Sequence, residues 1–188
     1  MVSSVLELIL FSIPSLVYER VLRAKGRTAQ QARSAVGWRI GDLRMYALAI
    51  VMSAVLLPLT YLALRGISQG SLDTSSRLHV TYGSASTPSG YASLALLALA
   101  EEILFRGLLA GILIRRLGFA VGNTLQALMF LAPHLLLLLV SVRLWPLLPV
   151  QLISGWLLGW LRDRSASVGP CAVAHILANV LAPVLIAA

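Results

Sequence analysis

The sequence is poor in cysteine and in charged residues. Its 188 residues contain one cysteine, Cys171, which excludes an internal disulfide and any metal site built from several cysteines. Charged residues make up 12% of the chain, whereas an ordinary soluble domain has about 25%. Hydrophobic residues reach 59%, and they come in runs of about twenty instead of the stripes of an amphipathic helix. We therefore expect a polytopic membrane protein.

Six apolar segments predict an all-α bundle of about six membrane helices. They cover residues 4–18, 43–64, 91–114, 121–142, 145–161 and 168–187. The first is short for a hydrocarbon core of about 30 Å and contains Glu7 and Pro14, so it either spans in a tilted form or lies partly in the interface. Residues 66–90 are polar and predict the one long loop. We treat 1–188 as one membrane domain, with N-terminal helices and loops in 1–90 and a core in 91–188.

Acidic residues and lysine are also scarce, and the remaining basic residues indicate the orientation. The net charge is +8, but the basic residues cluster between apolar runs and not on one accessible face, so no nucleic acid partner is expected. Eleven of them lie in the connections 19–44, 115–116 and 162–164, against three, Arg65, Arg77 and Arg143, on the other side. The positive-inside rule makes those connections cytoplasmic and turns both termini outward. The expected location is a membrane, with a bacterial inner (plasma) membrane favoured by the arginine-rich composition; a first segment that does not span would leave only the N-terminus inside.

Three ions interrupt the third apolar run, in the stretch LALAEEILFRGLLAG of residues 97–111. A central Glu or Arg costs about 2.5–3.5 kcal/mol in a membrane helix, so these groups need partners. Glu102 and Arg106 lie four residues apart, about 40° around a helix, and are expected to pair. Glu101 lies about 140° from Arg106 and is left over, as a general base would be.

Polar side chains also occur in the fourth and sixth apolar runs. His134 lies among leucines one turn after Phe130, and His175 and Asn179 share one helix face. A lone imidazole in a membrane is more often a hydrogen-bond partner between helices than a catalyst. Acid, imidazole and amide groups near mid-depth on three helices instead indicate one convergent site between the third, fourth and sixth helices.

These residues together resemble the motifs of the CAAX protease and bacteriocin-processing family, also called the Abi family of glutamic intramembrane proteases. The motifs are Glu101-Glu102-x-x-x-Arg106, Phe130-x-x-x-His134 and His175-x-x-x-Asn179, in this order on successive apolar runs. The resemblance covers about residues 91–183, and residues 1–90 carry no part of it that we can identify. One departure is Pro133, directly before His134, which predicts a kink or an unwound turn there.

The resemblance implies a metal-independent intramembrane endopeptidase that needs no cofactor. In this reading Glu101 is the general base, His134 holds and activates the water, and His175 with Asn179 stabilises the oxyanion. The supporting residues are Glu102, Arg106 and Phe130. The implied partners are the lipid bilayer and a membrane-anchored or lipid-modified peptide or protein, which is cut near its C-terminus or in a leader.

Missing motifs exclude several other chemistries, and two alternatives stay open. The His-Glu-x-x-His motif of a site-2 type zinc protease is absent. Ser154 lacks the Gly-x-Ser-Gly context of a serine intramembrane protease. An aspartyl intramembrane protease needs two aspartates inside the membrane, but all three aspartates fall between apolar runs, at Asp42, Asp73 and Asp163. Glu101, His134 and His175 are nevertheless enough for three zinc ligands and an open position, as in a zinc-dependent membrane protease. The second alternative is a non-catalytic membrane partner, such as a bacteriocin-immunity or assembly factor. Cys171, one turn before His175, is expected to be buried and inert.

Overall fold

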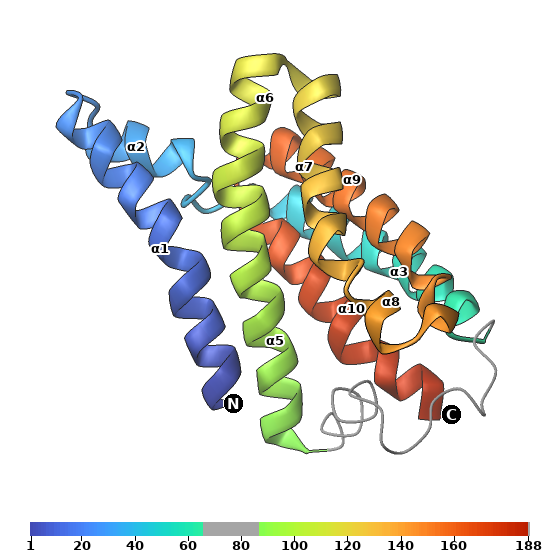
Figure 1. The fold of residues 1–188 in the computed structure, drawn as a ribbon. Coiled ribbons are helices and arrows are strands. Elements are labelled where there is room, and N and C mark those ends of the chain that lie inside the picture. Colours follow the sequence, from blue (N-terminus) through green and yellow to red (C-terminus); the bar gives the residue numbers. More distant parts are fainter. Residues whose placement is uncertain (66–86, 188) are drawn as a thin grey trace.

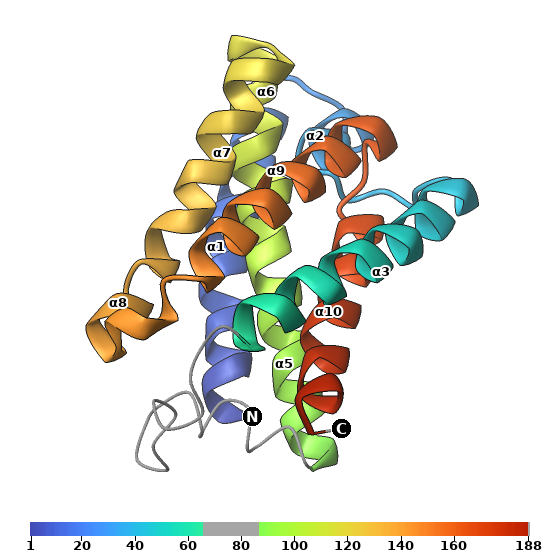
Figure 2. The same cartoon turned by 90° about the vertical axis from the view of Figure 1, so that its right-hand side faces the viewer.

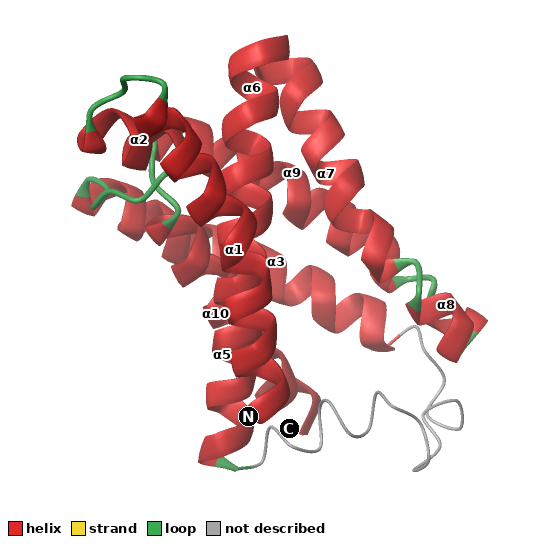
Figure 3. Ribbon diagram, turned by 60° about the vertical axis from the view of Figure 1, so that its left-hand side comes forward, coloured by secondary structure: helices red, strands yellow, loops and turns green. Residues whose placement is uncertain are grey.

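The computed structural model describes residues 1–65 and 87–187, and the secondary structure within these ranges is helical without strands (Figure 3). The elements are α1 (Val2–Ala24), α2 (Ala29–Ala35), α3 (Leu43–Arg65), α5 (Pro88–Glu102), the π-helix η3 (Ile103–Ala110), α6 (Gly111–Leu117), α7 (Phe119–His134), α8 (Leu137–Val140), the 3-10 helix η4 (Val142–Leu144), α9 (Leu147–Ser165) and α10 (Gly169–Ala187). The all-α prediction is confirmed for the described residues.

One long rod forms the axis of the bundle. It consists of α5, η3 and α6, and α7 returns beside α6 after a turn at Gly118 (Figure 1). On the other side α1 packs along α5 and η3. Behind the rod α10 packs against both α3 and α5, and α9 packs against α7 and α3 (Figure 2). Both termini lie at one end of the bundle, whereas α2 and the α6–α7 turn lie at the other (Figure 1).

Helix boundaries depart from the predicted segments at two prolines. The first helix runs through Pro14 to Ala24 and is longer than the predicted 4–18, because a single missing N–H does not end a helix that packs along α5 and η3. The fourth segment behaves differently, since α7 ends at His134 immediately after Pro133. There the Leu136 N–H bonds to the Pro133 carbonyl at 3.2 Å, three residues back, which is a tightened turn. The break predicted at Pro133 is therefore confirmed.

The predicted loop of residues 66–90 lies mostly outside the described residues. Its last residues instead form the start of α5, where Pro88 occupies the first turn. The Thr87 side chain accepts a hydrogen bond from the Gly90 N–H at 3.1 Å and caps the helix. A threonine followed by a proline is a helix-start signal, and the predicted boundary at 91 is a few residues too late.

Two helical stretches, Leu43–Ala63 and Phe119–Val140, are long and apolar enough to cross a membrane. In each, only 22% of the apolar window is buried inside the protein, so most of its side chains face outward as they do in lipid. A shorter apolar stretch is Gly169–Ala182. The described residues thus fit the membrane-protein class, while the count of six membrane helices stays a prediction.

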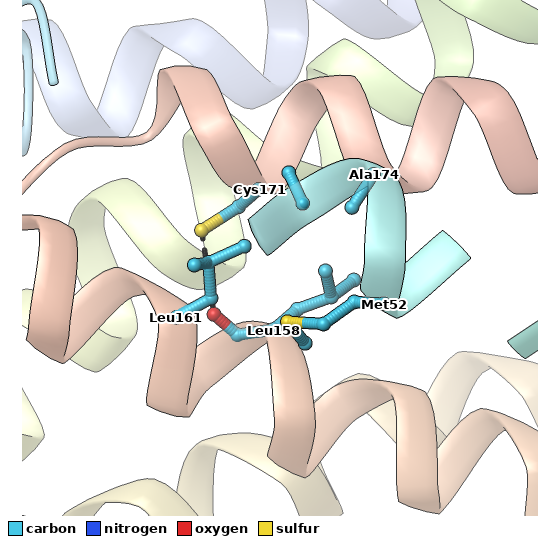
Figure 4. Packing of buried hydrophobic residues seen from close by; sticks show 6 residues of the cluster. Met52, Leu158, Leu161, Cys171 and Ala174 are labelled. Carbon is cyan, nitrogen blue, oxygen red and sulfur yellow. Dashed lines mark hydrogen bonds between the residues drawn. The ribbon is translucent and has the colours of Figure 1, made fainter. Parts of the chain in front are cut away.

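A small apolar core joins α3, α9 and α10. Its buried residues are Ala49, Met52, Leu158, Leu161, Cys171 and Ala174. Five of them are labelled in Figure 4, where the dashed line marks the Cys171 thiol bonding to the Leu158 carbonyl at 3.3 Å. The thiol is fully buried. Cys171 therefore serves packing, which agrees with the inert role expected from the sequence.

Gly122→Ala is expected to destabilise the bundle, because α7 crosses α6 there in backbone contact. A Cβ at Gly122 would lie 2.5 Å from the Leu113 carbonyl carbon and 2.6 Å from the Ile114 nitrogen. Backbone atoms cannot yield as a side chain can, so the free energy of unfolding should fall by about 1–3 kcal/mol. Thermal unfolding in detergent measures this, with the exposed Thr124→Ala on the same helix as control. Equal midpoints for both variants would contradict the packing described.

Candidate active site

The first motif lies where the central rod changes its helical geometry. Glu101 and Glu102 end α5, and Arg106 belongs to the π-helix η3. π-helical turns are rare and are often found at functional sites. Neighbouring helices bond to carbonyls of this turn: the Ser15 hydroxyl of α1 donates to the Ile103 carbonyl at 3.1 Å, and the Arg162 Nε of α9 donates to the Arg106 carbonyl at 3.1 Å. The π-helix is therefore held from two sides.

The predicted pairing of Glu102 with Arg106 is present. The Arg106 Nη1 donates to the Glu102 Oε1 at 2.7 Å, and both side chains are 0% exposed. The guanidinium also stacks over the Phe130 ring, at 4.1 Å from its centroid. Such a buried pair is stable only while both charges are present, because a lone buried charge is strongly destabilising.

His175 bridges the two glutamates of the motif. Its Nδ1 lies 2.8 Å from the Glu102 Oε1, and its Nε2 lies 3.7 Å from the Glu101 Oε2. The Glu101 side chain is 16% exposed. The carboxylate that helix geometry left over for a base therefore faces an imidazole and solvent-accessible space, whereas its neighbour is locked in the buried pair.

His134 has one ring nitrogen bonded to the main chain of its own helix. Its Nδ1 lies 2.8 Å from the Phe130 carbonyl oxygen. A carbonyl only accepts, so Nδ1 must carry the proton, and in the neutral ring Nε2 then bears a lone pair. The ring also packs on Phe130, with centroids 4.7 Å apart. The second motif thus fixes both the orientation and the tautomer of the imidazole.

The four residues predicted as catalytic line one cavity. Glu101, His134, His175 and Asn179 all contribute to the wall of a cavity of about 410 Å³. They come from α5, α7 and α10, which are the third, fourth and sixth apolar segments. The predicted supporting residues are fully buried, namely Glu102, Arg106 and Phe130. Phe130 packs against the imidazoles of both His134 and His175, so a single aromatic ring spaces the two histidines.

Within the described residues, no group of three His, Cys, Asp or Glu side chains is close enough together to hold a metal ion. Glu101, His134 and His175 line the same cavity, and both histidines direct Nδ1 to another partner. Metal-bound histidines have such Nδ1 partners too, so chelation is the test of the zinc alternative.

Several polar residues of the bundle escaped prediction from the sequence. The cavity wall also contains Gln151 and Ser154, which lie three residues apart on α9. Outside the cavity the Gln126 amide donates to the Gly155 carbonyl at 2.7 Å, and the Asn123 amide donates to the Trp156 carbonyl at 3.0 Å. In the sequence, each of them is an amide or hydroxyl side chain within an apolar run. Such a residue indicates that a buried polar contact exists, but it does not indicate which residue is the partner.

Arg162 is a further residue that the sequence misplaced. The sequence places it in a basic connection between two apolar runs, where an exposed side chain is expected, yet it is 6% exposed. Burial lowers the pKa of its guanidinium, chiefly through loss of solvent, but from a value so high that the group stays charged. It donates to the Arg106 carbonyl in η3 and, at 3.5 Å, to the Ser34 carbonyl of α2. It therefore ties the connection before α3 to the π-helix.

Arg162→Ala should lower stability, because it leaves the buried Arg106 carbonyl without this donor. An unsatisfied buried group costs about 1–3 kcal/mol. Arg164→Ala is the matched control, since Arg164 is exposed and its guanidinium lies 5.5 Å from the Trp160 ring centroid. Thermal midpoints in detergent compare the two. If both variants unfolded together with wild type, Arg162 would have no role in holding η3.

Comparison with known proteins identifies the family. Residues 83–181 match the family model described as type II CAAX prenyl endopeptidase Rce1-like. The match covers more than half of the chain, so the chain belongs to this family of membrane endopeptidases and the predicted resemblance is confirmed. It begins eight residues before the expected start at 91. No curated protein and no solved structure matches the chain.

Proposed function

We propose that the chain is an intramembrane endopeptidase of the glutamic type. Its reaction would be hydrolysis of a peptide bond in a membrane-anchored or lipid-modified protein or peptide, during C-terminal or leader processing. One observation carries the proposal: Glu101, His134, His175 and Asn179 line a single cavity. Glu102 and Arg106 neutralise each other beside it, so Glu101 is the carboxylate left for chemistry.

Glu101 and His134 are suited to activate water. A water bound between the Glu101 carboxylate and the lone pair of His134 Nε2 would lose its proton to Glu101 as its oxygen attacks the scissile carbonyl carbon. The C–N bond then breaks when the tetrahedral intermediate collapses, and Glu101 returns the proton to the leaving amine. Atoms and charge balance without a metal or cofactor, and we propose that none is needed.

Asn179 and His175 are suited to stabilise the oxyanion. The Asn179 amide is a neutral donor on the cavity wall. For His175 the contacts set a condition, because Nδ1 is already directed to Glu102. Nε2 can donate to an oxyanion only if it also carries a proton, so this role requires the imidazolium form of His175 between the two glutamates. Preorganised donors of this kind act on charge that forms only in the transition state.

We place the site near mid-depth in the membrane, between the third, fourth and sixth of about six membrane helices, with 91–188 as the catalytic core. The membrane would be a bacterial inner membrane, with the basic connections in the cytoplasm. The composition of the cavity wall supports a site inside the membrane, because leucines and valines surround a few polar groups and suit a peptide beside a bilayer.

The test is cleavage of membrane-anchored peptides, with and without lipid modification, by purified protein in detergent. Mass spectrometry should show new termini at one bond with wild type. Asn179→Ala should lower the rate by about 10²–10³-fold, as loss of an oxyanion donor does. Thr124→Ala, exposed on α7, should leave it unchanged. Folded wild-type protein that cuts no peptide, together with an Asn179→Ala chain that keeps its function in cells, would favour the non-catalytic partner.

A further inference from the structure

The cavity extends toward one end of the bundle only. On α5 it is lined by Leu94, Leu97 and Glu101, while the same rod continues past Arg106 to Arg115 at its far end. Beyond His134 the wall continues through Leu136, Leu137 and Val140, away from the α6–α7 turn. The cavity therefore runs from the polar residues away from that turn.

The cavity extends in the same direction along α9, α10 and α3. On α9 the lining runs from Leu147 to Leu158 and stops before Arg162. On α10 the lining begins at His175, in the middle part of the helix, and continues to Ala182, away from the start of the helix at Gly169. On α3 the contributing residues are Leu56 and Thr60, far from Arg44 in the first turn. All these helices place the cavity at the end away from their basic connections.

Hydrogen bonds gather those basic connections at one end. The Arg115 guanidinium donates to the Ala35 carbonyl at 2.7 Å, and the Ser167 hydroxyl donates to the Arg39 carbonyl at 2.6 Å. The Val168 N–H donates to the Gly37 carbonyl at 3.0 Å. The connections 19–44, 115–118 and 162–168 thus form one surface, which we call the basic end (α2 and the α6–α7 turn in Figure 1). The opposite end has Arg65 and Arg143 among the described residues.

Buried side chains close the cavity toward the basic end. Glu102, Arg106 and Phe130 are fully buried, and Phe105 packs edge-on against Phe130 at 5.1 Å between ring centroids. Behind them Arg162 bonds to both η3 and α2. Among the described residues, the cavity is therefore closed toward the basic end, and the rest of its wall lies toward the opposite end.

We infer that this chain acts on peptide bonds presented at the non-cytoplasmic face of the membrane. The positive-inside rule places the basic end in the cytoplasm, so the cavity opens outward. The inference rests on the proposed function and narrows its substrates to the outward juxtamembrane segment of a membrane-anchored peptide, which excludes a cytoplasmic C-terminus. The wall favours apolar residues beside the scissile bond, because most of its side chains are leucine, valine, alanine and proline.

Single introduced cysteines test the sidedness in intact cells and in inverted vesicles. The native thiol of Cys171 is fully buried, so the natural chain is the unlabelled background. Arg143→Cys and Arg116→Cys replace exposed arginines at opposite ends, and Ala178→Cys places a thiol in the cavity wall. A membrane-impermeant thiosulfonate should label Arg143→Cys and Ala178→Cys in intact cells, and Arg116→Cys only in inverted vesicles. Labelling of Ala178→Cys only in inverted vesicles, or from neither side, would overturn the inference.

Cleavage separates this inference from the proposed function. Wild-type protein that is inactive on all peptides in detergent would count against the proposed function, whatever the labelling shows. Wild-type protein that is active in detergent, but cuts an added peptide only in inverted vesicles, would overturn the outward orientation alone. We expect cleavage in right-side-out vesicles, and we expect the impermeant reagent to block it in Ala178→Cys but not in Arg116→Cys.

Discussion

Glu101→Gln is expected to remove nearly all hydrolysis while the protein keeps its fold. A positioned general base contributes about 10²–10⁴-fold to a rate, and an amide cannot take the proton of water. The substitution keeps the size of the side chain, and Glu101 takes no part in the buried Glu102–Arg106 pair. Its contact with His175 is long, at 3.7 Å, so little stability is lost.

The measurement compares initial cleavage rates and thermal midpoints of wild type, Glu101→Gln and a matched Glu→Gln change outside the cavity. Glu7 serves for the control, since it lies in the first half of α1 and does not line the cavity. Glu7→Gln should leave both quantities unchanged. A Glu101→Gln chain that cleaves at the wild-type rate would remove Glu101 from the mechanism.

Glu102→Gln should instead unfold the protein more easily. The substitution leaves Arg106 as a cation that is 0% exposed and without its counter-ion. Removing one partner of a buried ion pair costs about 3–5 kcal/mol. The thermal midpoint in detergent should therefore fall well below that of Glu101→Gln, although the two changes are chemically identical and adjacent in the chain.

A double variant separates charge from shape. Glu102→Gln with Arg106→Met removes both charges, so it should recover part of the stability lost in Glu102→Gln alone. Met retains a long, flexible side chain against Phe130, which the guanidinium covers at 4.1 Å. A single Glu102→Gln variant as stable as wild type would mean that the pair does not hold η3 to α7 and α10.

The sequence predicts the site where local helix geometry suffices. The spacing of Glu102 and Arg106 gives their pairing, and it leaves Glu101 over. The family motifs add His134, His175 and Asn179, and the structure lines one cavity with them and Glu101. Pro133 correctly marks the end of α7, because a residue without an N–H beside a polar cavity ends the helix there.

Other features depend on contacts between distant parts of the chain. The π-helix begins within the first motif, at Ile103, without a local signal, and its carbonyls accept hydrogen bonds from Ser15 of α1 and Arg162 of α9. The bridge of His175 between two glutamates joins residues 73 positions apart. Arg162 falls in a basic connection of the sequence, and its burial depends on the contact with α2, which lies far away in the chain. The sequence predicts a first segment of residues 4–18, interrupted by Pro14, whereas α1 continues to Ala24. The packing of α1 on α5 and η3, which supports the longer helix, is not visible in the local sequence.

Cleavage of a membrane-anchored peptide by the purified wild-type protein, after exhaustive chelation, decides whether Glu101 activates water without help from a metal. We expect the same product and the same rate with and without chelator. Loss of cleavage on chelation, with recovery on adding zinc, would contradict this expectation and would make Glu101, His134 and His175 candidate metal ligands.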